Sequence, residues 1–170
     1  MKQIDFSDSD INFVCNEEFK QKRENMNDPY LSEDFATKRL IAEYEKYNSL
    51  IIAFDFDDTI YDFHKKGYTY EAVIQLLRDL KHIGCYLICY TGNDNTDMIK
   101  RYLKTNDIPF DSINEQFPSY PNQSSRKIYA NAYLDDRAGL SEVFKQLYEV
   151  IQFTEHKNHI REMRKNASIY

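Results

Sequence analysis

The chain has 170 residues, a net charge of −6 and 42% hydrophobic residues, enough for one compact domain with a substantial core. Charged residues make up 29% and there are only four Gly and four Pro, which excludes a collagen-like or low-complexity chain. The acidic balance, 22 Lys and Arg against 28 Asp and Glu, argues against a general nucleic-acid binder.

Residues 1–48 have the pattern of helices. The first ten residues are acidic and lack an apolar core, so we expect no signal peptide. The apolar face of a first helix comprises Ile11, Val14, Cys15, Phe19 and Met26. After Pro29, Ser32 is a candidate N-cap for a second helix. Its inward face comprises Phe35, Leu40, Ile41, Tyr44 and Tyr47. We interpret this N-terminal helical extension either as a packing element or as a lid over a neighbouring site.

From residue 49 onward, strands and helices alternate. The run LIIAFDF (50–56) predicts a strand that is buried on both faces. Thr69 is a candidate cap for the next helix, and Gly84 stands where a glycine ends a helix. The apolar face of this helix comprises Ala72, Val73, Leu76, Leu77, Leu80 and Ile83. The run CYLICY (85–90) predicts a second buried strand.

The alternation continues in the second half. A helix begins at Asn93 or Asp94, with Met98, Ile99, Tyr102 and Leu103 on its inward face. Strands are expected at 112–114 and 131–135, then a helix with Val143, Phe144, Leu147 and Tyr148 facing inward, then a last strand at 148–153 and a last helix at 155–165. This alternation predicts an α/β fold with a central parallel sheet between helices. The domain spans residues 49–170.

The three cysteines carry no disulfide or zinc pattern. Their number is odd, and Cys85 and Cys89 have three residues between them, where a redox or zinc motif has two. Both alternate with Leu87 along one face of a predicted strand, so we interpret them as small buried hydrophobic residues. The longest apolar run, Leu50–Phe54, is too short to cross a bilayer. We therefore expect a cytoplasmic protein without a membrane partner.

Acidic residues gather at the carboxyl ends of predicted strands, where parallel α/β sheets bind ligands. Asp55 and Asp57 follow the first strand, and Asp135 and Asp136 follow a later one. Helix capping accounts for single Asp or Thr residues, but not for four carboxylates at two strand ends that could meet. A divalent metal with oxygen ligands, Mg²⁺, would compensate their charge.

These residues resemble the motifs of the haloacid dehalogenase (HAD) superfamily. Residues 51–60 (IIAFDFDDTI) resemble motif I, an apolar strand followed by DxDxT. Residues 88–92 (ICYTG) resemble motif II, residues 133–136 (YLDD) resemble the acidic motif IV, and Lys127 is a candidate for the motif III lysine. The resemblance covers about residues 50–153. It implies a HAD-type three-layer sandwich around the parallel sheet.

The resemblance also implies a Mg²⁺-dependent phosphohydrolase. Asp55 would be the nucleophile that forms an aspartyl-phosphate, and Asp57 would protonate the leaving oxygen and then activate water. The metal would lie between the Asp55 carboxylate, the Asp57 backbone carbonyl and motif IV. Asp136 would be a direct ligand, and Asp135 would bind directly or through water. The phosphoryl oxygens would be held by Thr91, Gly92 and Lys127.

The positively charged residues near these motifs leave alternatives open. Lys127 lies closer to motif IV than the corresponding lysine of many family members. Two alternatives therefore stay open: Arg126 is the phosphate-binding cation, or Lys127 is a surface lysine without a role in the site. Arg137 follows the acidic pair and could screen it. His64, in the loop after motif I, receives no role.

The spacing between motifs predicts a capless enzyme, because the segments between Ile60 and Thr69 and between Thr91 and Lys127 are too short for an inserted cap domain. The loop after motif I is aromatic, and its rings either stack on a nucleobase or pack the loop. These residues are Tyr61, Phe63, Tyr68 and Tyr70. Together with the DD form of motif IV, the loop resembles that of some deoxynucleotidases and favours a (deoxy)nucleotide monophosphate as substrate.

Two other functions are compatible with the same residues. One is a phosphatase that acts on phosphoproteins or on nucleic-acid ends, and the other is a non-catalytic module that keeps the fold and a phosphate pocket. The presence of both Asp55 and Asp57 favours an enzyme over such a module.

Overall fold

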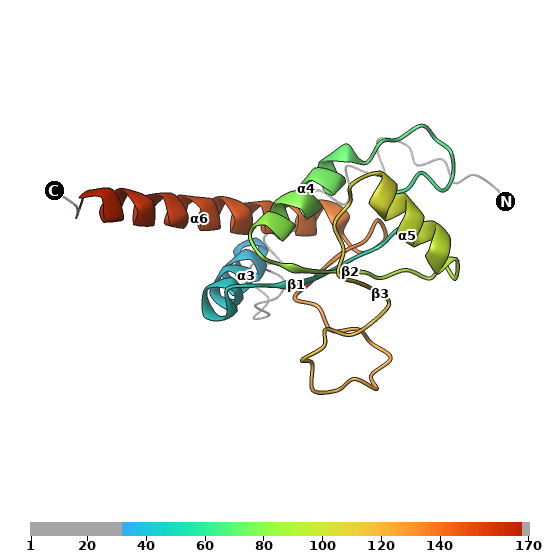
Figure 1. The fold of residues 1–170 in the computed structure, drawn as a ribbon, viewed down its shortest axis with the longest axis horizontal. Helices are drawn as coiled ribbons and strands as arrows, with labels where there is room; N and C mark the ends of the chain where they lie inside the picture. Colours follow the sequence, from blue (N-terminus) through green and yellow to red (C-terminus); the bar gives the residue numbers. More distant parts are fainter. Residues whose placement is uncertain (1–31, 168–170) are drawn as a thin grey trace, which may run out of the picture. The chain divides into compact units, whose positions relative to one another are not determined.

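The computed structural model describes residues 32–167, which form four helices and four strands (Figure 1). The elements in chain order are α3 (Glu33–Tyr47), β1 (Ile51–Phe54), α4 (Glu71–His82), β2 (Tyr86–Cys89), α5 (Thr96–Thr105), β3 (Ser112–Ile113), β4 (Ala132–Leu134) and α6 (Leu140–Ala167). The first predicted helix, with Ile11 to Met26, lies outside the described residues. The chain divides between Lys38 and Arg39 into two units, and the fold described below is that of the second. The domain boundary after residue 48 stays a prediction.

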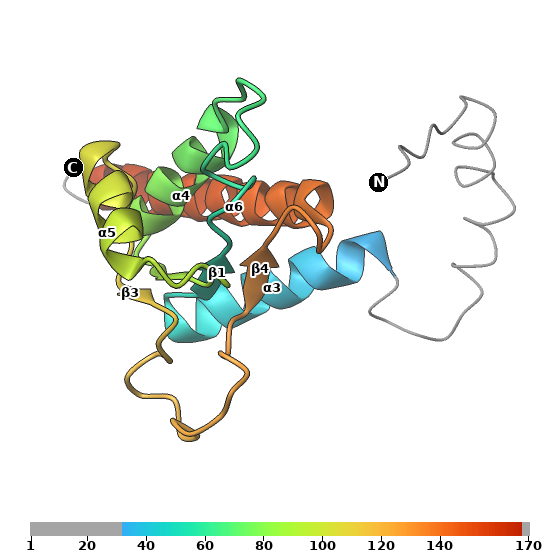
Figure 2. The ribbon, with the colours of Figure 1, turned by 90° about the vertical axis from the view of Figure 1, so that its right-hand side faces the viewer.

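A parallel sheet in the order β3-β2-β1-β4 forms the centre of the fold (Figures 1 and 2). Helix α4 connects β1 to β2 and helix α5 connects β2 to β3, as the alternating pattern predicts. The α/β class and the parallel sheet are therefore confirmed. Strands β2 and β3 lie on one side of β1, and β4 lies on the other side. The strand order therefore reverses between β1 and β4. Open α/β sheets bind ligands beyond the carboxyl ends of the strands at such a point.

The core consists of the strands and one face of the helices. Cys89 and its β1 partner Phe54 are fully buried, as expected of strands covered on both faces. Cys85 and Cys89 are free thiols. Burial raises the pKa of Cys85 to about 11 and that of Cys89 to about 12, so both stay neutral. Their interpretation as small hydrophobic residues is confirmed. Helix α4 contacts α6 and β2, and α6 contacts β4.

Helix α4 ends as predicted. Gly84 follows its last turn with a φ of 90°, which glycine adopts without strain. The Gly84 N–H donates to the carbonyl of Lys81 and the Cys85 N–H to that of Leu80, each at 3.0 Å. This pair of bonds is a Schellman motif, and it turns the chain directly into β2.

Helix α4 begins later than predicted. The N-cap is Tyr70, which has a left-handed backbone with a φ of 52° and makes no side-chain cap hydrogen bond. The prediction of a Thr69 cap is therefore wrong. The predicted inward face is confirmed except at one position: Ala72 is exposed, and Ile74, which was not predicted, is buried.

Helix α5 also begins later than predicted. Asn95 is its N-cap, and the Asn95 side-chain oxygen accepts the Met98 N–H at 3.1 Å. The prediction of a start at Asn93 or Asp94 is wrong because these residues belong to the loop that follows β2. The inward face is confirmed: Ile99 and Leu103 are buried, and Met98 and Tyr102 pack against the core.

The C-terminal segment is a single helix, α6, of 28 residues. The predicted strand at 148–153 is wrong. Residues 155–165 are helical as predicted, but they continue α6 and do not form a separate helix. The buried positions follow helical spacing instead: Leu147, Val150, Ile151 and Thr154. Tyr148, predicted to face inward, is 50% exposed. Despite its length, neither α6 nor any other helix within residues 32–167 is long and apolar enough to cross a membrane.

The part of α3 from Arg39 onward belongs to the same unit as the sheet. Leu40 and Tyr44 are buried in the core, and the Tyr44 hydroxyl donates to the Ile83 carbonyl at 2.7 Å. Tyr47, predicted to face inward, is 63% exposed. This part of α3 therefore contributes to the core through one face.

Candidate active site

Three carboxylates meet where β1 and β4 end. The two strands pair in parallel, and the Asp55 N–H extends the pairing by donating to the Leu134 carbonyl at 2.8 Å. Asp55 directly follows β1, and Asp135 and Asp136 directly follow β4. One carboxylate oxygen from each of the three lies within 4.8 Å of the others. The structure thus brings together three of the four carboxylates that the sequence singles out.

This grouping has an electrostatic cost. The pKa of Asp55 is raised to about 6. Burial is the largest cause, the nearby charges of Asp135, Asp136 and Asp57 act in the same direction, and a hydrogen bond from the Phe56 backbone opposes them. Such crowding calls for a compensating cation. Three convergent carboxylates form an all-oxygen donor set, which suits a hard divalent ion such as Mg²⁺.

Asp57 lies beside this group but is not part of it. Its Oδ2 accepts a hydrogen bond from the Asn93 side chain at 3.3 Å. Its Oδ1 is buried and has no hydrogen-bond partner among the described residues. Buried polar atoms are nearly always paired, and the exceptions concentrate at functional sites. Asp57 therefore has one buried carboxylate oxygen without a partner beside the three convergent carboxylates, within the part of the chain that the structure describes.

The turn after β1 is tied to the turn after β4 by Thr59. Its hydroxyl oxygen, fully buried, accepts the Asp136 N–H at 3.1 Å. The turn itself is tight, because the Asp58 N–H donates to the Tyr61 carbonyl at 2.8 Å and Asp58 has a left-handed φ of 57°. This accounts for a threonine at this position: it fixes the two acidic turns relative to each other.

Asp58 is paired with His64 through a short contact between a carboxylate oxygen and Nδ1. Desolvation by itself raises the pKa of Asp58, but the hydrogen bonds and charge of His64 outweigh it and hold the pKa below the usual value. His64, which the sequence left without a role, therefore anchors the loop after motif I.

Thr91 is held at the end of β2 by Asn114. The Thr91 N–H donates to Asn114 Oδ1 at 2.9 Å, and Asn114 Nδ2 donates to the Thr91 carbonyl at 2.7 Å. The Thr91 hydroxyl oxygen accepts the Asn93 N–H at 3.1 Å, which leaves the hydroxyl proton available for a ligand. Gly92 is exposed, and a Cβ there would meet nothing within 4 Å.

A cavity of about 500 Å³ opens over these groups. We call it the carboxylate cavity; its lining residues are Asp55, Asp57, Asp58, Phe63, His64, Tyr90, Thr91, Gly92, Asp135, Asp136 and Arg137. Every site residue predicted from the sequence except Lys127 therefore lines one cavity. Its volume is in the range of small-molecule sites.

Lys127 does not line the carboxylate cavity. It is exposed in the loop between β3 and β4, where its backbone carbonyl accepts hydrogen bonds from the side chains of Gln116 and Ser125 at 2.8 and 2.9 Å. Arg126, the alternative cation, lines a neighbouring cavity. Arg137 does line the carboxylate cavity, with Nε 3.8 Å from an oxygen of Asp136, which fits the expected screening role.

Local backbone N–H groups bond to two of the four carboxylates, since Asp55 accepts a hydrogen bond from the Phe56 backbone and Asp135 accepts one from Arg137. Asp135 Oδ1 accepts the Arg137 N–H at 2.8 Å. None of the four caps α4 or α5, whose N-caps are Tyr70 and Asn95. Local backbone bonding therefore accounts in part for Asp55 and Asp135, and it leaves the convergence of both with Asp136 unexplained.

The aromatic residues after motif I have different environments. Tyr61 stacks on the buried Phe56, with ring centroids 5.0 Å apart, and meets the edge of Tyr102 at 5.1 Å. Tyr61 therefore packs the loop. Phe63 is 53% exposed and lines the carboxylate cavity.

Several residues of the site escape sequence reasoning. Tyr90, Asn93 and Asn114 hold or line the site, but the pairing of Asn114 with Thr91 depends on β2 and β3 being neighbours. One available signal was position, because Asn114 directly follows β3 just as the acidic residues follow β1 and β4.

Comparison with known proteins shows the fold alone. No family model matches the chain, and no curated protein does. A solved structure of a conserved protein from Bacteroides thetaiotaomicron is similar, with a TM-score of 0.50 and 23% identity. The match covers 59% of this chain and 91% of the other. It supports the α/β architecture and says nothing about activity.

Proposed function

We propose that the protein is a Mg²⁺-dependent phosphohydrolase of the HAD type that works through an aspartyl-phosphate. The observation that carries the proposal is the convergence of Asp55, Asp135 and Asp136 at the strand-order reversal, with the unpaired oxygen of Asp57 beside them. The sequence resemblance and the geometry point to the same residues. The HAD-type arrangement and the enzymatic activity are both part of this proposal.

In the proposed reaction, an oxygen of Asp55 attacks the phosphorus and the bond to the leaving oxygen breaks, while Asp57 donates a proton to that oxygen. Water then attacks the aspartyl-phosphate as Asp57 takes its proton, and inorganic phosphate leaves. Thr91 and Gly92 bind phosphoryl oxygens through the Thr91 hydroxyl and the exposed backbone. Mg²⁺, held by Asp55, Asp136, Asp135 and the Asp57 carbonyl, would neutralise charge on the phosphoryl group.

The chain's organisation supports a capless enzyme with an accessible site. Only a loop connects β1 to α4, and the segment from β2 to β4 holds α5, β3 and one further loop. We infer a small phosphorylated substrate, a (deoxy)nucleotide monophosphate, in preference to phosphoproteins or nucleic-acid ends. We place the protein in the cytoplasm.

The proposal is tested by measuring phosphate release from nucleotides, sugar phosphates and phosphopeptides, with Mg²⁺ and with EDTA. We expect Mg²⁺-dependent turnover that falls by several orders of magnitude in Asp55→Asn and Asp57→Asn. Asp97→Asn, on the exposed first turn of α5, is the matched control and should keep full activity. Mg²⁺-dependent turnover that persists in purified Asp55→Asn would disprove the nucleophile.

A further inference from the structure

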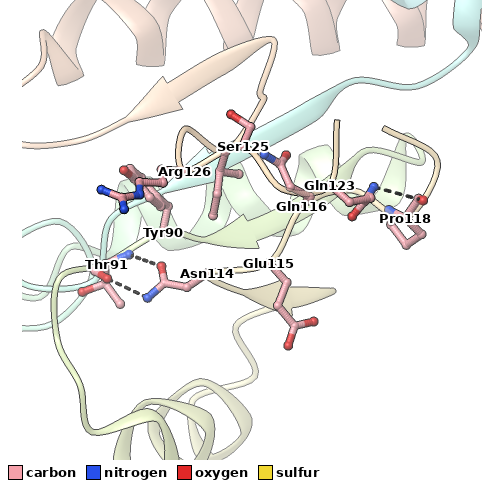
Figure 3. Close-up of a pocket in the computed structure, with 10 residues that line it drawn as sticks. Tyr90, Thr91, Asn114, Glu115, Gln116, Pro118, Gln123, Ser125 and Arg126 are labelled. Carbon is pink, nitrogen blue, oxygen red and sulfur yellow. Dashed lines mark hydrogen bonds between the residues drawn. The ribbon is translucent and has the colours of Figure 1, made fainter. Parts of the chain in front are cut away.

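A second cavity, of about 720 Å³, shares lining residues with the carboxylate cavity. Figure 3 shows the residues that line it. We call it the loop cavity, because most of its wall comes from the segment between β3 and β4, from Asn114 to Ile128. Tyr90 and Thr91 line both cavities. A molecule whose phosphoryl group sits against Thr91 therefore has the loop cavity directly beside it.

The amide side chains of the loop cavity are already committed to holding its wall. Gln116 Nε2 donates to the Lys127 carbonyl at 2.8 Å, and Gln116 Oε1 accepts the Tyr129 N–H at 3.0 Å. Gln123 Nε2 lies within 2.6 to 3.2 Å of three backbone carbonyls, those of Phe117, Pro118 and Tyr120. The loop has no helix or strand, yet these bonds give the cavity a defined shape.

Besides the Thr91 hydroxyl, the groups that extend from the lining include an aromatic ring, a cation and an anion. Tyr90 is 40% exposed, and it contacts Tyr133 edge-on, with ring centroids 6.3 Å apart. The side chains of Arg126 and Glu115 make no hydrogen bond or ion pair within residues 32–167, and Glu115 points away from Arg126 in Figure 3. The Glu115 backbone carbonyl accepts a hydrogen bond from the Ser112 hydroxyl at 3.2 Å. Arg126 is the one positively charged side chain among the lining residues, and with Glu115 the lining carries no net charge, so the cavity is poorly equipped for a second phosphate.

We propose that the loop cavity binds the leaving group of the substrate, and that this group is an uncharged planar ring system, the nucleoside of a nucleoside monophosphate. The proposal rests on the phosphohydrolase function above. Nucleobases stack on aromatic rings and on guanidinium planes, the two free surfaces that Tyr90 and Arg126 offer. Tyr90 and Arg126 are then the residues that determine specificity, and the aromatic loop between β1 and α4 does not bind the base.

The test compares kcat/KM for a nucleoside monophosphate and for ribose 5-phosphate, which lacks the base. In Tyr90→Leu and Arg126→Gln we expect kcat/KM for the nucleotide to fall about tenfold. In Arg126→Gln, whose side chain lines the loop cavity and not the carboxylate cavity, kcat/KM for ribose 5-phosphate should change less than about twofold, and in Tyr90→Leu it should fall less than that for the nucleotide. Tyr90→Phe keeps the ring and should restore nucleotide turnover. Tyr148→Leu and Lys145→Gln, exposed on α6, are matched controls.

Three results would overturn the proposal. One is equal turnover of ribose 5-phosphate and the nucleotide by the wild type. Another is an equal loss for both substrates in Arg126→Gln, which would place Arg126 on the phosphoryl group. The third is a preference of the wild type for a nucleoside bisphosphate over the monophosphate that is lost in Arg126→Gln.

A binding measurement separates this proposal from the phosphohydrolase function. Nucleoside monophosphate is titrated calorimetrically, with Mg²⁺, into Asp55→Asn and into Asp55→Asn with Tyr90→Leu. About tenfold weaker binding by the double variant supports the loop cavity even if no substrate is turned over. Equal affinity, or no binding by either variant, rejects it.

Discussion

At the scale of single residues, Asp55 is the group whose environment most opposes its charge. Its pKa in the folded chain is about 6, against 3.8 for an ordinary aspartate, chiefly because of burial. The folded state therefore holds the Asp55 proton more tightly than the unfolded state does. As pH rises from 3.8 to 6, the free energy of unfolding falls, and above pH 6 the full penalty is present.

Asp55→Asn removes this penalty. The full shift corresponds to about 3 kcal/mol, and partial exposure to solvent reduces it, so we expect a gain of about 1 to 2 kcal/mol in metal-free protein at pH 7.5. The gain should shrink toward pH 5. Urea unfolding of both proteins in EDTA at the two pH values measures it. Saturating Mg²⁺ should stabilise the wild type more than the variant. A variant less stable than the wild type in EDTA at pH 7.5 contradicts the expected charge crowding.

The two acidic residues after β4 are expected to contribute unequally to Mg²⁺ binding. Asp135 already accepts the Arg137 N–H, whereas the Asp136 carboxylate makes only a long contact with Arg137. We expect Asp136→Ala to weaken Mg²⁺ affinity at least several-fold more than Asp135→Ala. Calorimetric titration of both variants measures the difference. Undiminished Mg²⁺ affinity in both would mean that the metal lies elsewhere.

At the scale of elements, Gly84 terminates α4 through a left-handed backbone. A Cβ at this position would lie 3.9 Å from the Asn48 carbonyl oxygen, an ordinary contact, so the cost of Gly84→Ala is conformational. We expect a destabilisation of about 1 kcal/mol. Gly92→Ala is the control, because Gly92 is not left-handed and has open space around it. Chemical denaturation should leave the stability of the control within a few tenths of a kcal/mol of the wild type. Equal stability of Gly84→Ala and Gly92→Ala would refute the strain at Gly84.

What the sequence predicts well at this scale is set by local chemistry. The buried strands β1 and β2, the inward faces of α4 and α5 and the Gly84 end of α4 all follow from apolar spacing and glycine. The start of α4 does not, since Tyr70 adopts its left-handed backbone where the ordinary cap signal was Thr69. Residues 148–153 also mislead: their β-branched and aromatic side chains favour a strand, but packing of Val150 and Ile151 into the core selects the helix.

The candidate site divides in the same way. Asp55, Asp57, Thr91, Asp135 and Asp136 could be identified because strand ends meet in a parallel sheet. Arg126 and Tyr90 could be placed beside a cavity only by the folded loop between β3 and β4, whose shape depends on Gln116 and Gln123 bonding to distant backbone atoms. Single-sequence patterns do not encode those bonds.

At the scale of the whole molecule, residues 1–48 are the part whose role the sequence left open between packing and a lid. A chain that begins at Ser32 keeps Leu40 and Tyr44, whereas a chain that begins at Ser49 loses both from the core. The loss of a buried leucine alone costs about 2 to 5 kcal/mol. Ser32 is therefore the start that tests the N-terminal residues without damaging the core.

We expect the chain from Ser32 to have a lower melting temperature and an unchanged ratio of kcat/KM for a nucleotide to kcat/KM for an aryl phosphate. The physical reason is that the apolar face predicted for Ile11 to Met26 needs a surface to cover, and removing it exposes that surface. A lid would act differently, because it contributes binding energy from parts of the substrate remote from phosphorus. Its removal would lower the ratio several-fold and leave aryl phosphate turnover intact. Kinetics of both substrates on the two chains, with melting curves of each, therefore decide between a packing element and a lid.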